Sequence, residues 1–179
     1  MKSIQLLLVA FCLPILAFSQ DITGLWTGTL YNDSTQNEHN YEIGIVLENG
    51  RYVGYSHTWF TIDEKKYFGL KKVKVKIAPD GKVIIEDAAL LLNDYPLEAH
   101  KNVRQLNVLD FGSNDELKTL NGPFVTNRTK TYVPLTGKVQ LKKVKNTIQS
   151  ELVFRLQQLG KGLEQAFVQN TGEPLVKND

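Results

Sequence analysis

The chain has 179 residues, a formal net charge of +2 and a single cysteine. A charge so close to zero gives no sign of a nucleic-acid-binding surface. The cysteine, Cys12, lies in a segment that we expect to be removed, so the mature chain should have no disulfide, no thiolate metal site and no cysteine nucleophile. The protein must therefore fold on its hydrophobic core alone, which a chain of this size can supply.

Residues 1–19 have the three-part form of a secretory signal. Lys2 supplies the charged start, an apolar run follows from Leu6 to Phe18, and Ala17 and Ser19 stand at the small-residue positions of a cleavage site. The apolar run is too short for a comfortable transmembrane helix, and no other long apolar stretch follows. We therefore expect an exported protein, periplasmic or extracellular, and infer a Gram-negative host from the style of the signal.

The chain from Gly24 to Lys143 reads as eight short runs rich in β-branched and aromatic residues, separated by turn residues. We expect strands at about 24–31, 41–48, 51–60, 66–78, 82–92, 103–110, 116–126 and 135–143. Asn49-Gly50 and Asp80-Gly81 favour tight hairpins between neighbouring runs. Eight antiparallel strands with one apolar face can close into a small barrel that holds side chains or one small ligand. The sequence thus predicts a mainly β fold, an eight-stranded up-and-down barrel over residues 20–145.

Lysines gather in the fourth run, at Lys71, Lys72, Lys74 and Lys76. The last three alternate with apolar residues, so we interpret the cluster as a solvated strand face. The apolar residues between Phe68 and Ile77 change parity midway. The sequence therefore leaves open which strand faces point inward.

A helical pattern replaces the strand pattern after Lys145. Apolar residues recur at spacings of three and four, at Leu152, Leu156, Leu159, Leu163 and Phe167. Ser150 is suited to cap the start of this helix. We assign residues 146–179 to a helix and tail that pack on the barrel or on a partner.

Gly24-Leu25-Trp26 heads the first predicted strand, as the G-x-W signature does in lipocalins. With eight strands followed by one amphipathic helix, the chain resembles the lipocalin group of the calycin superfamily. The resemblance implies that Trp26 closes the barrel floor, covered by Lys138, Lys142 or Lys143 in place of the family's arginine. It also implies a helix packed on the outer wall.

An eight-stranded outer-membrane barrel is the alternative architecture, because it also follows a signal peptide and alternates apolar with polar residues. It would place Val73, Val75 and Ile77 on lipid and the lysines inside. Against it, the predicted strands lack aromatic girdles and the chain does not end in a strand.

The third run carries the candidate ligand-binding residues. Tyr55, His57 and Trp59 share one strand face, which would form an amphipathic aromatic lining if it pointed inward. The alternative interpretation is that the aromatic residues are ordinary core or surface and that His57 is an ordinary polar residue.

The sequence shows no set of residues with the spacing of a known catalytic or metal-binding motif. His39 and His100 fall in separate predicted loops without metal-ligand spacing, and the adjacent carboxylates of Asp63-Glu64 and Glu86-Asp87 would point to opposite faces of a strand. We predict no catalytic residues, no metal and no cofactor. The enzymatic alternative is a hydrolase whose residues come from different strands.

Two functions follow from these patterns. The first is a non-enzymatic carrier whose barrel holds a small apolar or amphipathic ligand. The second is an accessory subunit of a bacterial cell-envelope complex that binds a protein partner through the barrel surface or the helix stripe. Space left inside the barrel would favour the first, and a filled interior the second.

Overall fold

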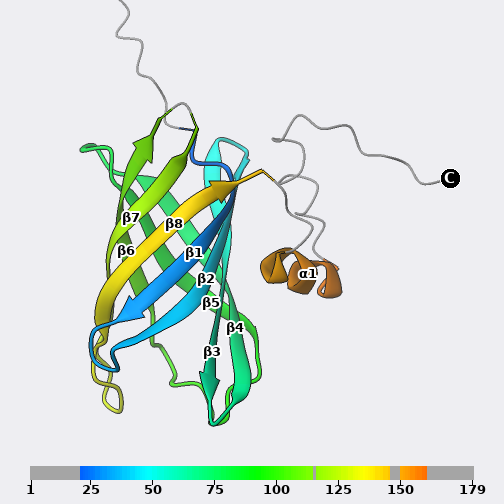
Figure 1. Ribbon diagram of the computed structural model, residues 1–179, viewed down its shortest axis with the longest axis vertical. Coiled ribbons are helices and arrows are strands. Elements are labelled where there is room, and N and C mark those ends of the chain that lie inside the picture. The colour runs from blue at the N-terminus through cyan, green and yellow to red at the C-terminus, as the bar shows by residue number, and fades with distance from the viewer. Residues whose placement is uncertain (1–20, 115, 146–149, 161–179) are drawn as a thin grey trace, which may run out of the picture.

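The computed structural model describes residues 21–114, 116–145 and 150–160, so the predicted signal lies outside the described residues. The elements are β1 (Gly24–Asn32), β2 (Asn37–Glu48), β3 (Arg51–Ile62), β4 (Lys65–Ile77), β5 (Val83–Asn93), β6 (Gln105–Ser113), β7 (Lys118–Thr126), β8 (Thr136–Val144) and α1 (Glu151–Gln158). The strands pair antiparallel in sequence order, and β8 closes on β1 (Figure 1). The predicted fold class, an eight-stranded up-and-down barrel followed by one helix, is confirmed.

The barrel has two unlike ends. At one end, here called the floor, the chain enters at residues 21–23 beside the β2–β3, β4–β5 and β6–β7 turns. At the opposite end, here called the mouth, lie the β1–β2, β3–β4, β5–β6 and β7–β8 loops, at the bottom of Figure 1. The longest of these mouth loops spans residues 94–104, between β5 and β6.

Both predicted hairpins form at the floor end. Asn49 and Gly50 have φ angles of 50° and 74°, which fits a two-residue turn with both central residues in the left-handed region. The second turn is wider, since the Ala78 N–H donates to the Lys82 carbonyl at 2.9 Å, and Gly81 adopts a φ of 83°. The two dipeptides therefore mark turns of different lengths.

The floor is closed around Trp26. This side chain is fully buried, its indole N–H donates to the Ile22 carbonyl at 2.9 Å, and Phe111 packs edge-on at 6.2 Å between ring centroids. Of the three lysines considered from the sequence, Lys143 lies over the indole, with Nζ 6.0 Å from the ring centroid. The floor thus ends in apolar contacts capped by one cation.

Side chains of β4 alternate between the inside and the outside of the wall. Val73 and Val75 belong to the interior core, whereas Lys72, Lys74 and Lys76 are exposed. This is the reverse of the arrangement that the outer-membrane alternative requires. Among the described residues no helix has the length and apolarity needed to cross a membrane.

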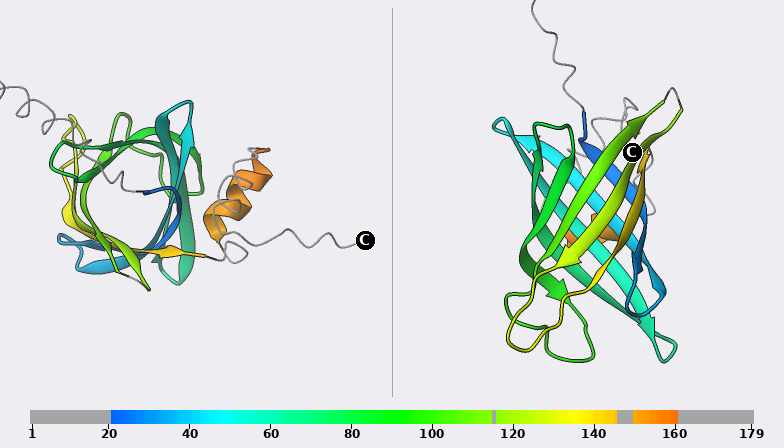
Figure 2. Two further views of the ribbon diagram at one scale, coloured as in Figure 1. Left: turned by 90° about the horizontal axis from the view of Figure 1, so that it is seen from above. Right: turned by 90° about the vertical axis from the view of Figure 1, so that its left-hand side faces the viewer.

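The helix α1 packs on the outer wall, over β2 and β3 (Figure 2). Its buried residues Leu152, Val153 and Leu156 form a second apolar cluster with residues of the wall. The wall residues at its centre are Leu25, Val46, Tyr55 and Leu70. Covering Leu70 explains the parity change in β4, because an apolar residue on the outer face is buried there by the helix.

Candidate binding site at the barrel mouth

The barrel interior changes character from floor to mouth. Around Trp26 it is filled by aliphatic side chains that are at most 1% exposed, among them Ile43, Ile85, Leu109 and Leu141. Nearer the mouth a polar layer begins, in which Tyr41 is hydrogen-bonded to Ser56 and Asn107. Burial, and then the nearby Asp87 carboxylate, raise the pKa of the Tyr41 phenol, so Tyr41 stays neutral and acts as a hydrogen-bonding group.

An inward-facing ion pair lies on the mouth side of this polar layer. Lys71 Nζ lies 2.5 Å from Asp87 Oδ2, and the same oxygen accepts the Gln105 backbone N–H at 3.0 Å. The Asp87 side chain is 6% exposed, but that of Lys71 is 26% exposed although it points into the barrel. Burial lowers the pKa of Lys71, yet Asp87 outweighs it and leaves that pKa raised, so Lys71 is charged at neutral pH.

Pairing between strands explains why this ion pair forms here. The β5–β6 ladder ends at Glu86–Leu106, and β4 pairs with β5 through irregular register at Leu70/Lys71 and Lys72/Val73. Asp87 therefore stands at the point where β5 and β6 separate, and its carboxylate binds a backbone donor of β6 that the strand ladder leaves open.

Aromatic rings form a collar at the mouth. Phe60 lies at the centre, with ring centroids 5.9 Å from His39, 6.0 Å from Tyr67 and 5.7 Å from Tyr95. Tyr95 comes from the loop 94–104 and crosses the β4 backbone at Gly69, where an added β-carbon would overlap its hydroxyl group. The collar thus lies at the mouth end of the interior, next to Lys71, whose charge interacts with Tyr95.

The loop that carries Tyr95 is tied to the strands at its start. Asp94 accepts the Phe68 backbone N–H at 2.6 Å, and its own N–H donates to the Phe68 carbonyl at 3.3 Å. Further along the loop, His100 lies 5.2 Å from Tyr132 of the β7–β8 loop. The mouth therefore combines aromatic surface, one ion pair and phenol hydroxyls, a mixture suited to an amphipathic molecule.

The three ligand-binding residues predicted from the sequence lie elsewhere. Strand register places Tyr55, His57 and Trp59 on the outer face of β3, so they do not line the interior. Tyr55 is buried in the cluster beneath α1, His57 is 1% exposed, and Trp59 is half-buried at 5.1 Å from His57. The structure thus brings the three residues together, under and beside α1.

The predicted partner-binding stripe is partly used by the protein itself. Leu152 and Leu156 are fully buried against the barrel, while Leu159 is 38% exposed. Leu163 and Phe167 lie outside the described residues.

Sequence reasoning missed Lys71, Asp87 and Tyr95 as site residues. Lys71 does not belong with the solvated lysines, because it shares the parity of Val73 and Val75, and this shared parity is the sequence signal for its inward direction. No group of three or more metal-ligating side chains occurs within the described ranges.

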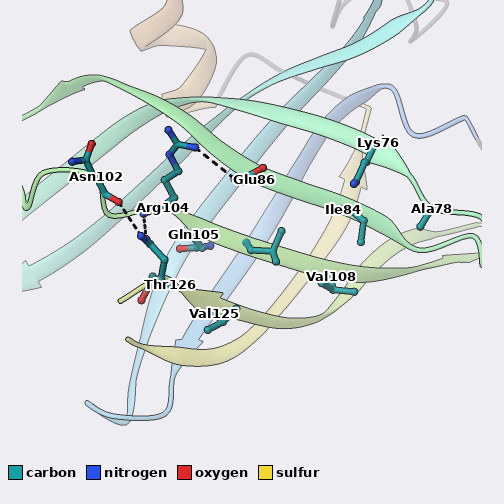
Figure 3. A pocket seen from close by; sticks show the side chains of 12 residues that line it. Lys76, Ala78, Ile84, Glu86, Asn102, Arg104, Gln105, Val108, Val125 and Thr126 are labelled. Atoms are coloured by element: carbon teal, nitrogen blue, oxygen red, sulfur yellow. Dashed lines mark hydrogen bonds and ion pairs between the residues drawn. The ribbon is translucent and has the colours of Figure 1, made fainter. Parts of the chain in front are cut away.

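A concave surface lies on the outer wall over β5, β6 and β7 (Figure 3). This groove has a volume of about 940 Å³ and an apolar floor that includes Ile84, Val108 and Val125. Lys76 stands on its border, and Arg104 faces Glu86 at 3.8 Å within it.

Comparison of the chain with protein-family models, with curated proteins and with solved structures gives no match.

Proposed function

We propose that this chain is a non-enzymatic binding protein whose barrel takes up a small amphipathic molecule through its mouth. The observation that carries the proposal is the partial exposure of Lys71, an interior side chain that solvent still reaches at 26%. Water reaches this cation in the mouth half, whereas the floor half is filled by apolar side chains, and this difference supports binding at the mouth.

The chemistry of the mouth favours a ligand with a planar or apolar body and a polar head. Phe60, Tyr67 and Tyr95 offer ring surface, and Lys71 keeps N–H donors beyond the one that Asp87 uses. Because Asp87 neutralises the ammonium, the pair is suited to hydrogen bonding as much as to charge attraction.

The proposal includes a relationship to lipocalins. Its support is the G-x-W start, the closed eight-stranded barrel, the capping of Trp26 by Lys143 and the single helix on the outer wall. Export remains a prediction from residues 1–19.

Native mass spectrometry of the mature protein, purified gently from its own host, tests the proposal. A bound mass of a few hundred daltons that is lost on denaturation supports a carrier. Thr58 faces inward beside Gly69, whereas Thr29 faces outward on β1. Thr58→Trp should therefore abolish the bound mass and Thr29→Trp should leave it, and retention of the mass in Thr58→Trp would contradict a site at the mouth.

A second candidate is a partner-binding module, and the outer groove is the observation that favours it. Its occupant would be an extended apolar segment of another protein with an acidic side chain for Lys76, which makes no ion pair with the described residues. A stoichiometric protein partner and an empty barrel in the same mass spectrum would favour this function over the first.

A further inference from the structure

A buried carboxylate on the barrel wall holds the start of α1. Glu42 is 5% exposed, and its Oε2 accepts the Leu152 backbone N–H at 2.7 Å and the Ser150 hydroxyl at 3.2 Å. Ser150 in turn accepts the Val153 N–H at 3.2 Å, which confirms the predicted N-cap. The helix is therefore fixed to the wall by polar contacts as well as by its apolar face.

Next to this contact lies a histidine whose ring makes no hydrogen bond to the part of the chain that the structure describes. His57 is the cross-strand neighbour of Glu42, and neither of its ring nitrogens has a hydrogen-bond partner among the described residues. The centroid of its ring lies 5.1 Å from that of Trp59 and 5.5 Å from that of Phe68. A buried polar group without a partner costs free energy that contact with water would recover.

Charged groups reach His57 from each neighbouring element. Glu42 faces it from β2, Lys66 from β4, Arg155 from α1, and Asp94 from the loop after β5. Arg155 itself lies 4.2 Å from the Phe68 ring centroid, so the helix places a cation beside the imidazole. Burial first, and then Arg155 and Lys66, lower the pKa of His57 to about 4, and Asp94 opposes them.

We propose that α1 is a detachable cover on the barrel wall, and that proton uptake by His57 weakens its docking. An eight-residue helix is not stable alone in water, so the segment is helical only while it is docked. Undocking uncovers an apolar strip on the wall formed by Leu25, Val46, Tyr55 and Leu70.

The direction of the pH effect follows from linkage. With α1 docked the pKa of His57 is about 4, and undocking, which exposes the ring and removes Arg155, raises that pKa toward the ordinary value of 6.5. The contribution of neutral His57 to docking is therefore full above pH 6.5 and is lost as the pH falls toward 4. Burial first, and then the Glu151 charge, raise the pKa of Glu42, although the hydrogen bonds from Leu152 and Ser150 oppose the shift. Protonated Glu42 therefore favours docking at low pH, and this effect is lost as the pH rises through the raised pKa. On acidification the two groups therefore oppose each other, and Glu42→Gln, which removes the opposing group, should deepen the release.

Hydrogen–deuterium exchange of the full mature chain at pH 7 and pH 5, corrected for intrinsic rates, tests the proposal. We expect residues 151–158 to lose protection by about tenfold at pH 5, while β2 keeps its protection. In His57→Phe, a ring fills the same space between Trp59 and Phe68 but takes up no proton. The additional loss of protection at pH 5 should therefore vanish in this variant. The matched control, His39→Phe at the mouth, should behave as the wild type.

Three results would overturn the proposal. These are an unchanged helix in the wild type at pH 5, the same loss in His57→Phe, and an equal loss of protection throughout the barrel. If His57→Phe does not fold, an NMR titration of the His57 ring in the wild type decides. An ordinary pKa near 6.5 while α1 stays protected would likewise overturn the proposal.

Discussion

Lys71 and Asp87 form an ion pair inside the barrel, with 2.5 Å between Nζ and Oδ2, at the point where β5 and β6 separate. Removing one member of a buried pair leaves the other charge uncompensated. We expect Lys71→Met to lower the free energy of unfolding by about 3 kcal/mol, the low end of the usual range because Lys71 keeps some solvent contact.

Urea unfolding of three variants checks this expectation. Lys72→Met on the outer face is the matched control and should change stability by less than about 0.5 kcal/mol. The double variant Lys71→Met/Asp87→Asn should recover part of the loss, since it removes both charges. A loss in Lys72→Met as large as that in Lys71→Met would show that the pair has no special role.

The collar depends on a glycine. A β-carbon at Gly69 would overlap the Tyr95 hydroxyl, so Gly69→Ala should displace the Tyr95 ring and the start of the loop 94–104. We expect a loss of about 1–3 kcal/mol, as for other overpacked sites. Thermal unfolding measures the loss, and Gly69→Ala/Tyr95→Ala should largely remove the overlap. An equal defect in the double variant would mean that Tyr95 is not the residue displaced.

How far the sequence predicts this molecule differs between the barrel and the mouth. Strand number, the Asn49-Gly50 turn and the Ser150 cap follow from local patterns, because alternation and capping depend on near neighbours. Lys71 shares the parity of the interior residues Val73 and Val75, but its ion pair with Asp87 depends on irregular pairing between β4 and β5, which joins residues far apart in sequence. The outward direction of His57 likewise depends on which face the helix covers, and a strand pattern does not contain that information.

The β3–β4 turn shows a local feature that the sequence did not mark. Asp63 and Glu64 form its two central residues, with φ angles of 47° and 64°, although no glycine is present. The left-handed conformation is costly for Glu64, whereas glycine adopts it freely. We expect Asp63→Asn/Glu64→Gly to raise the free energy of unfolding by about 0.5–1 kcal/mol, measured by urea unfolding. Unchanged or reduced stability would contradict a turn of this type.

The two faces of α1 give the last prediction. Leu156 is fully buried against the wall, whereas Phe154 is 50% exposed on the other side. Truncating a buried leucine usually costs 2–5 kcal/mol, but the helix can detach without unfolding the barrel. We therefore expect Leu156→Ala to abolish protection of residues 151–158 in hydrogen exchange while the melting temperature of the barrel stays within a few degrees. Phe154→Ala should retain that protection. If the barrel strands in Leu156→Ala lost their protection together with the helix, α1 would instead be an integral part of the core.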